Sequence, residues 1–220
     1  ISFSYPDSVQ IRSYKPNTVG HPGQLKRVVT ALKHAKRPLI CAGGGVFLAD
    51  AQDSLAAFSE QTNIPIVTTM MGLSAVSPNN PRNFGMIGMH GCSGANRAMN
   101  SADVVLLIGA RVGDRAIMSP MGLAKNALII HIDIDPAEIG KNIETDIPLV
   151  GDANNILLEL CEKADAITCE PWYEPLKPSK AADYEPYAGC VRPQHMIETL
   201  CDQCESDAVL CADVGQNQIW

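Results

Sequence analysis

RPLICAGGGVFLADA, residues 37–51, joins a short apolar run to three consecutive glycines and then to a helix-like segment. Continuous apolar runs of this length are typical of strands buried in parallel sheets. Glycine lets the backbone turn tightly and lets a ligand approach it closely. Because a glycine-rich turn between a strand and a helix is common in dinucleotide-binding loops, the stretch predicts a strand–turn–helix unit of that kind.

The same alternation continues on both sides of this stretch. Apolar runs predict strands over 38–42, 64–69, 102–110, 126–135 and 147–152. Helical spacing of apolar residues predicts helices over 23–35, 49–62, 93–101 and 154–164, with a short turn or helix at 138–142. We therefore expect a doubly wound, Rossmann-like α/β fold: a mainly parallel sheet with helices on both faces.

Composition divides the chain into four parts. Residues 1–22 predict an extended lead-in from a preceding domain, and 23–164 predict the α/β domain. Residues 165–187 are rich in proline and charge, which is typical of a linker. Residues 188–220 predict a helix, a strand and a turn, the truncated start of another domain. The chain lacks an initiator Met and stops at Trp220, so we expect a piece of a longer protein.

Charge and hydropathy exclude several classes of partner. The net charge of −7 argues against binding to nucleic-acid phosphates, which needs a basic face. No apolar run reaches the roughly 18–20 residues of a membrane span. The first residues show neither a basic nor an apolar secretory region. We therefore expect a cytoplasmic protein with no nucleic-acid or membrane partner.

The chain has eight scattered cysteines. Their apolar or helical contexts favour free thiols in a reducing compartment over a disulfide scaffold. Cys201 and Cys204 have CxxC spacing, with Cys190 and His195 upstream, so a zinc or redox site is an alternative. Because no second pair accompanies them, ordinary thiols are the favoured interpretation.

Ligands of open parallel sheets bind beyond the carboxyl ends of the strands. Candidate residues lie at the end of each predicted strand, and His90 lies in the segment before the third predicted strand. The candidates are Gly43, Gly44, Gly45, Thr69, Met70, His90, Gly109, Arg111, Asp114, Arg115, Asp133, Asp135, Gly151 and Asp152. Each also has a purely structural interpretation. The glycines suit turns, Asp135 and Asp152 suit helix N-caps, Arg111 suits an ion pair, and His90 suits an ordinary loop. Their gathering on one edge favours an extended dinucleotide.

An NAD site agrees poorly with the details. Its fingerprint is G-x-G-x-x-G/A with an acid at the tip of the second strand. Here Leu48 occupies the last glycine position, and the second strand ends in Thr68 and Thr69. Strand periodicity instead places Asp133 and Asp135 on one side of the fourth predicted strand. Asp133 is the carboxylate that we expect to contact the nucleotide.

Several strings together resemble one family: RSYKP, GHPGQLKR, KRPLICAGGGV, IPIVTTMMGL, GMIGMHG, GARVGDR, HIDIDPAEIGKN, IPLVGDA and ADVGQNQIW. They are similar to the catalytic subunit of acetolactate synthase (acetohydroxyacid synthase) over about residues 5–164 and 190–220. The resemblance implies the central FAD-binding domain of a thiamine-diphosphate-dependent transferase. In branched-chain amino acid biosynthesis, that enzyme condenses a pyruvate-derived hydroxyethyl group on thiamine diphosphate with a second 2-oxo acid.

The resemblance also implies a set of cofactor contacts. The FAD, structural in this family, would be held by Arg12, Gly43, Gly44, Gly45, Thr69, Met70, Ile87, Gly88, Met89, His90, Gly109, Ala110, Arg111, Val112, Asp133, Ile134, Asp152 and Ala153. Gln216 and Asn217 match a pair that contacts thiamine diphosphate. Three positions depart from the family pattern: Ser74 replaces Gly, Gly113 replaces Asp and Asn217 replaces His.

The family's catalytic glutamate and its magnesium motif match nothing in this chain. The resemblance therefore implies no catalytic residue and no metal ligand here, an inactive isolated piece, and a Mg²⁺-dependent full-length enzyme. That enzyme would be a dimer or tetramer, with a possible regulatory subunit. Two other interpretations stay open: the central domain of another thiamine-diphosphate carboligase or decarboxylase, or a non-catalytic FAD or nucleotide module. The terminal string DVGQNQIW argues against an electron-transfer module.

Overall fold

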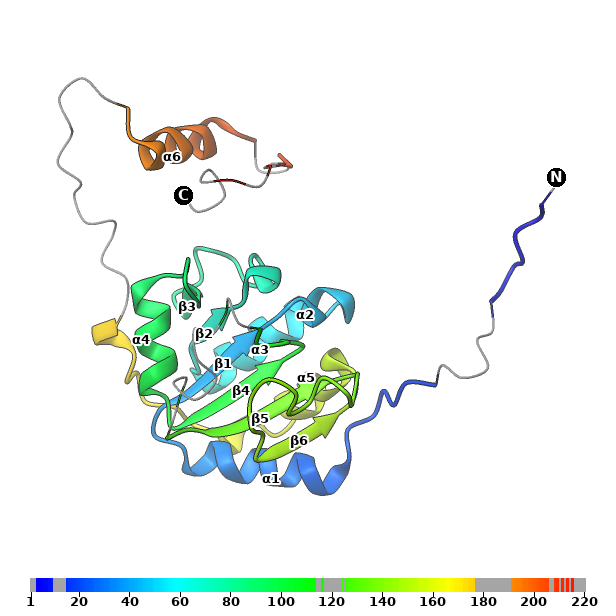
Figure 1. Ribbon diagram of the computed structural model, residues 1–220. Helices are drawn as coiled ribbons and strands as arrows, with labels where there is room; N and C mark the ends of the chain where they lie inside the picture. The colour runs from blue at the N-terminus through cyan, green and yellow to red at the C-terminus, as the bar shows by residue number, and fades with distance from the viewer. Residues whose placement is uncertain are drawn as a thin grey trace. The chain divides into compact units, whose positions relative to one another are not determined.

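The computed structural model describes residues 3–9, 15–113, 116, 124, 126–176, 191–205, 208–209, 211, 213 and 215. The chain divides into two compact units, Ile1–Pro178 and Ser179–Trp220 (Figure 1). In the second unit, the described helix is α6 (Pro193–Gln203). The strand predicted after it falls mostly outside the described residues.

The first unit is built on a six-stranded sheet with the order β3-β2-β1-β4-β5-β6. The strands are β1 (Pro38–Ala42), β2 (Ile66–Thr68), β3 (Asn83–Met86), β4 (Val104–Ile108), β5 (Leu128–Asp133) and β6 (Ile147–Val150). All neighbouring strands pair in parallel, with Ile40 of β1 between Ile66 of β2 and Leu106 of β4. The predicted doubly wound α/β fold is confirmed.

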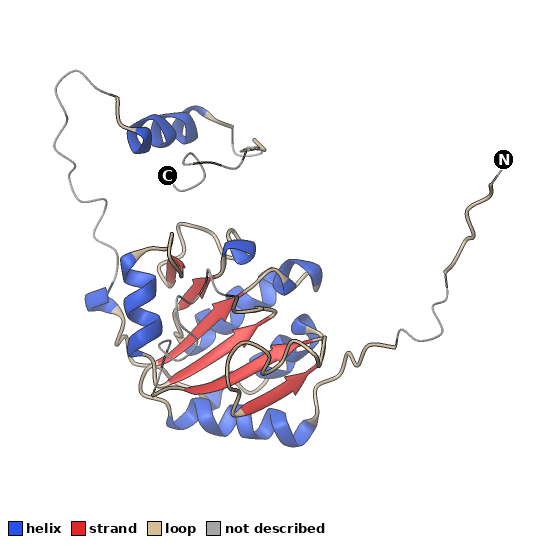
Figure 2. Ribbon diagram, viewed as in Figure 1, coloured by secondary structure: helices blue, strands red, loops and turns tan. Residues whose placement is uncertain are grey.

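Helices cover both faces of the sheet, as Figure 2 shows. The helices are α1 (Pro22–His34), α2 (Gly45–Leu48), α3 (Gln52–Thr62), α4 (Ser93–Ser101) and α5 (Ala153–Cys161). Strand residues such as Ile40 and Leu106 share one core with α1, α3 and α5, while Leu39 and Leu107 share another with α4. Because side chains alternate along a strand, five-residue apolar runs supply both cores.

Two elements differ from the sequence prediction. The helix predicted over 49–62 begins only at Gln52, as α3, and a separate short helix, α2, forms before it over Gly45–Leu48; Asp50, between the two helices, has a positive φ of 51° and keeps them apart. No strand was predicted over the residues of β3. This strand lies at the edge of the sheet with a register shift against β2, so its pairing depends on tertiary context more than on its own residues.

The segment that follows α5 packs against the α/β domain, although its composition predicts a linker from residue 165. Cys169 and Tyr173 are buried, and the Tyr173 hydroxyl donates to Asn63 Oδ1 at 2.7 Å. The Trp172 indole donates to the Pro38 carbonyl at 3.2 Å. Residues 167–176 therefore belong to the first domain. The rest of the predicted linker, 177–187, lies outside the described residues.

Candidate functional site

The turns after β1 and β4 meet at the point where the strand order reverses. A Cβ added to Gly45 would lie 2.6 Å from Gly109 Cα, and a Cβ added to Gly43 would lie 2.2 Å from the Gly109 oxygen. The Gly45 amide donates to the Gly109 carbonyl at 3.0 Å. This contact excludes side chains from both turns. It leaves a backbone-lined crevice at the switch point, where open α/β sheets bind ligands.

A groove runs along the carboxyl edge on both sides of this contact. Its larger part, about 620 Å³, is lined by Gly44, Gly45, Leu48, Thr69, Met70, Met71, Gly109, Arg111, Val112, Gly113 and Ala116. Its smaller part, about 220 Å³, is lined by Gly45, Leu48, Ala49, Gly109, Arg111, Asp133, Ile134, Asp135, Glu138, Asp152 and Ala153. Because four residues line both parts, we treat the two parts as one groove.

The smaller part of the groove is polar. Asp133 Oδ1 accepts from the Asp135 amide at 2.9 Å, and Asp135 Oδ1 accepts from the Ala137 amide at 2.9 Å. Asp152 is the N-cap of α5, with Oδ1 accepting from the Asn155 amide at 3.0 Å. The structural interpretation of Asp152 as a cap is therefore confirmed. Among the described residues, the second oxygen of each of these carboxylates accepts no hydrogen bond, which suits acceptance from ribose hydroxyls.

Arg111 lies between the two parts of the groove. Its side chain is 81% exposed, and its Nε is 3.9 Å from Glu138 Oε2. Glu138 bonds more closely to Lys141, at 2.9 Å. An ion pair as long and exposed as that of Arg111 contributes little to stability. The guanidinium is therefore available to an anionic or aromatic ligand.

The larger part of the groove has an apolar rim. Leu48 is 93% exposed, Met71 74% and Met70 51%. Large apolar side chains this exposed, gathered around a groove, mark a surface that a ligand or another protein segment covers. The rim suits a flat heterocycle better than a charged group.

The turn after β3 joins the same edge through Ile87, whose amide donates to the Thr68 carbonyl at 2.9 Å. Gly88 has a φ of 106°, while Met89 and His90 are exposed. The structure therefore brings the glycine–methionine–histidine turn beside Thr69, as expected. Ile87, Gly88, Met89 and His90 are not among the residues that line the groove.

Three predicted contacts have roles other than lining. Gly43 and Ala110 are buried and pack against each other, and Ile87 is buried below its turn. They shape the site from beneath instead of facing a ligand with side chains. Val112 lines the groove with a φ of 43°, which is strained for a β-branched residue. Arg12, Asp114, Arg115, Gln216 and Asn217 lie outside the described residues.

His131 lies beneath the polar part of the groove, in the middle of β5. It is 1% exposed, and its ring nitrogens are buried beside the backbone of Ala110. Burial lowers the pKa of His131, and the Asp133 carboxylate, the Ala110 backbone and the Glu138 carboxylate oppose that shift. The imidazole is therefore neutral at physiological pH, so it contributes no positive charge to the groove.

Leu48, Met71 and Glu138 line the groove but were not predicted as site residues. In the sequence, Leu48 was noted only because it departs from the NAD fingerprint. Its exposure depends on the direction of α2 after the glycine turn. Glu138 stands in the predicted turn at 138–142, five residues after Asp133. Its position in a loop that follows the end of a strand was the sequence feature that could have indicated Glu138 as a site residue.

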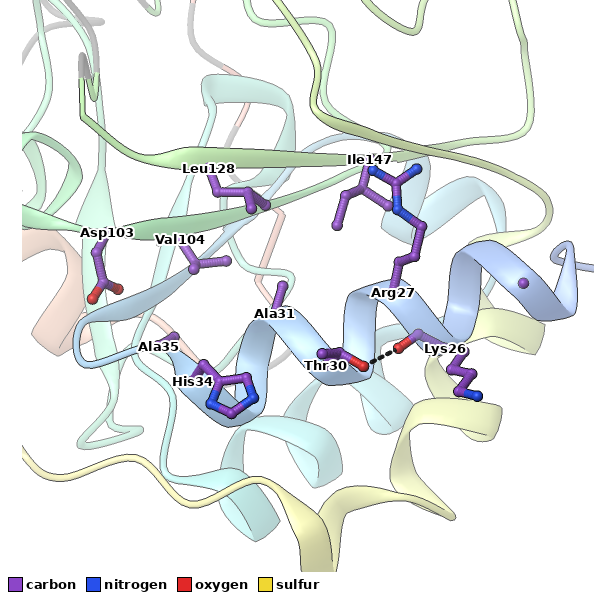
Figure 3. Close-up of a pocket in the computed structure, with 11 residues that line it drawn as sticks. Lys26, Arg27, Thr30, Ala31, His34, Ala35, Asp103, Val104, Leu128 and Ile147 are labelled. Atoms are coloured by element: carbon purple, nitrogen blue, oxygen red, sulfur yellow. Dashed lines mark hydrogen bonds between the residues drawn. The ribbon is translucent and has the colours of Figure 1, made fainter.

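A second groove of about 620 Å³ lies at the opposite edge, between α1 and the amino ends of β4, β5 and β6 (Figure 3). Its floor is apolar, formed by side chains such as Val104, Leu128 and Ile147. Asp103 accepts from the amides of Lys36 and Arg37, both at 2.8 Å, so its carboxylate is already satisfied. In Figure 3, Lys26 and His34 point away from the strands. Arg27 donates to Gln24 Oε1 at 2.9 Å and to the Asp146 carbonyl at 3.2 Å, so its guanidinium is also engaged within the protein. This groove therefore suits a nucleotide less well than the groove at the carboxyl edge.

Among the described residues, no group of three or more His, Cys, Asp or Glu gathers as a metal site, and no helix is long and apolar enough to cross a membrane. The described cysteines are free, with Cys201 exposed and Cys204 partly buried on and after α6. Cys190 lies outside the described residues.

The sequence matches a family model described as "Thiamine pyrophosphate enzyme, central domain" over residues 25–160. Among curated proteins, it is 39% identical to the probable acetolactate synthase large subunit of Methanococcus aeolicus, covering 98% of this chain and 39% of that protein. It is 37% identical to the acetolactate synthase isozyme 3 large subunit of Escherichia coli, covering 100% and 40% respectively. The chain thus spans about two fifths of the length of these relatives.

Proposed function

Because the chain belongs to the family of thiamine pyrophosphate enzyme central domains, we propose that it is the FAD-binding central domain of an acetolactate synthase catalytic subunit. The observation that carries this proposal is the groove divided by the Gly45–Gly109 contact, with an apolar part and a carboxylate-lined part. The names of the relatives support acetolactate synthase over another carboligase or decarboxylase.

The residues present fit an FAD. A pyrophosphate carries negative charge and needs close backbone approach, which the glycine turns and the exposed Arg111 supply. The carboxylates of Asp133 and Asp152 suit the hydroxyls of the adenosine ribose. Leu48, Met70 and Met71 suit the faces of the flavin ring. We propose that the FAD has a structural role and that none of these residues performs acid–base chemistry.

The activity that we propose for the whole enzyme is the condensation of two 2-oxo acids in branched-chain amino acid biosynthesis, in the cytoplasm. Thiamine diphosphate, bound with Mg²⁺, would supply the electron sink for breaking and forming the carbon–carbon bonds. In the present chain, Gln216 and Asn217 are the proposed contacts to that cofactor. A homodimer or tetramer, with a possible regulatory subunit, is the proposed assembly.

A nicotinamide dinucleotide is the competing ligand for a Rossmann-like sheet. It would need an acid at the tip of β2, where this chain has Thr68, a buried residue whose Oγ1 has no partner in the described structure. The carboxylate that could bind a ribose hydroxyl, that of Asp133, lies instead at the end of β5. We therefore propose FAD over NAD.

The experiment is a titration of the purified chain with FAD, FMN and NAD, followed by flavin fluorescence and calorimetry. We expect weak FAD binding, still weaker FMN binding because FMN lacks the adenosine half, and no displacement of FAD by NAD. Tight NAD binding without FAD binding would reject the proposal. The activity itself is tested by asking whether the full-length protein that contains this chain converts pyruvate to acetolactate.

A further inference from the structure

Asn96, in the first turn of α4, forms two hydrogen bonds with the backbone of a single residue, Gly88, in the turn after β3, an arrangement that we call the clamp. Its Oδ1 accepts from the Gly88 amide at 2.8 Å, and its Nδ2 donates to the Gly88 carbonyl at 3.0 Å. A primary amide can satisfy one backbone donor and one acceptor in this way, much as a neighbouring strand does. The clamp therefore fixes both polar groups of a single residue.

The clamped residue has a backbone conformation that requires glycine. Gly88 has a φ of 106°, a conformation that is open to glycine and rarely adopted by other residues. The turn is also tight: the Gly91 amide donates to the Gly88 carbonyl at 3.0 Å, and the Cys92 amide donates to the Met86 carbonyl at 2.7 Å. The orientation of the Gly88 peptide therefore decides where Met89 and His90 emerge.

These contacts connect a helix to the ligand edge of the sheet. The turn begins at Ile87, which is hydrogen-bonded to Thr68 beside Thr69, a residue that lines the larger part of the groove. Asn96 itself is only partly buried and touches the Gly88 backbone through both polar atoms of its side chain. It reaches the site through that peptide alone.

We infer that Asn96 is a positioning residue for the cofactor edge: it holds the Gly88 backbone and so keeps the turn after β3 against the Thr68–Thr69 end of the groove in which we propose the FAD. This inference rests on the proposed FAD site. It assigns no chemistry to Asn96. Loss of the clamp should weaken FAD binding and leave the domain folded, because the turn follows the edge strand of the sheet.

Asn100 provides a matched control. It is exposed on the same helix, one turn after Asn96, and the same substitution there makes the same change in helix propensity. The test compares Asn96→Ala, Asn96→Asp and Asn100→Ala in three measurements: thermal unfolding, FAD affinity, and hydrogen exchange of the Gly88 amide by NMR. Asn96→Asp retains the acceptor for the Gly88 amide but places a carboxylate against the Gly88 carbonyl.

We expect Asn96→Ala to lose the protection of the Gly88 amide and to bind FAD about tenfold more weakly, the effect of losing one or two ordinary hydrogen bonds. Asn96→Asp should retain part of the amide protection. Asn100→Ala should match the wild type in Gly88 amide protection and in FAD affinity. Unchanged Gly88 exchange in Asn96→Ala overturns the clamp. Lost protection with unchanged FAD affinity overturns the positioning role.

The same data separate this inference from the proposed function. A wild-type chain that shows no FAD binding rejects the proposed function, and with it any role of Asn96 toward that cofactor. Gly88 exchange then still shows whether the clamp exists. If Asn96→Ala fails to fold, Asn96→Asp carries the comparison, since it keeps one of the two bonds.

Discussion

Gly43 does not line the groove, yet its replacement should damage the fold more than replacement of Gly44 or Gly113, which do line it. In Gly43→Ala, the new Cβ would lie 2.2 Å from the Gly109 oxygen and 2.5 Å from Ala110 Cα, both short of the 3.4 Å at which ordinary contact begins. Since both neighbours are backbone, the turns after β1 and β4 would have to separate by about 1 Å to restore normal packing.

That separation breaks specific bonds. The Gly43 amide donates to the Ile108 carbonyl at 2.9 Å, and the Gly45 amide donates to the Gly109 carbonyl at 3.0 Å. Overpacking costs about 1–3 kcal/mol, and two weakened hydrogen bonds add about 1 kcal/mol each. A total of about 3–5 kcal/mol should lower the melting temperature by about 10 °C, taking about 2–4 °C per kcal/mol for a domain of this size.

The assay is thermal unfolding followed by circular dichroism, with two other glycines of the same edge as controls. A Cβ on Gly113 meets nothing within 4 Å, so Gly113→Ala should melt close to the wild type. A Cβ on Gly44 would approach Met71 Cβ at 3.1 Å, so Gly44→Ala should be intermediate. If Gly43→Ala melts within about 2 °C of Gly113→Ala, given the shift expected above, the close approach of the two turns is refuted.

Three further predictions concern buried polar groups. Because burial lowers the pKa of His131 in the folded state, the stability that depends on its neutral form is fully present above the ordinary pKa of about 6.5. That stability is lost as pH falls below this value, by at most about 1.4 kcal/mol per pH unit. Urea midpoints measured at several pH values should fall with pH in the wild type and fall less in His131→Leu, and an equal pH dependence of the two midpoints would contradict this prediction. Thr68→Val replaces a buried hydroxyl that has no partner in the described structure, so its urea midpoint should equal or exceed that of the wild type, whereas a loss above about 1 kcal/mol would reveal a missed hydrogen bond. Burial raises the pKa of the Cys41 thiol to about 12, so a thiol reagent at pH 8 should modify the exposed Cys92 in the native protein but should reach Cys41 only after unfolding.

Much of the fold was predictable because its signals are local. The apolar run 38–42 and the glycines after it depend on neighbours within a few residues, and the structure has a strand and a tight turn there. Strand β3 was not predictable in the same way. Asn83 and Gly85 have low strand propensity, and the segment pairs only because β2 presents a free edge.

In the candidate site, too, some residues could be predicted from local sequence signals and others depend on tertiary contacts. Sheet topology places the predicted glycines, Arg111 and Asp133 around one groove, since all of them follow parallel strands. Asn96 gave no signal, because its contact with Gly88 depends on how the turn folds back onto α4. Tyr173 and Trp172 were assigned to a linker because composition reflects proline and charge, and it cannot show the buried surface that these aromatic side chains cover.

The central claim is that an FAD occupies the carboxyl-edge groove. Hydrogen exchange measured by mass spectrometry, with and without saturating FAD, tests it directly, because the two candidate grooves lie on opposite edges of the sheet. We predict slower exchange in peptides that cover 43–48, 69–71 and 109–113, and unchanged exchange along α1. Protection along α1 and at the starts of β4 and β5, with none at the glycine turns, would contradict the account.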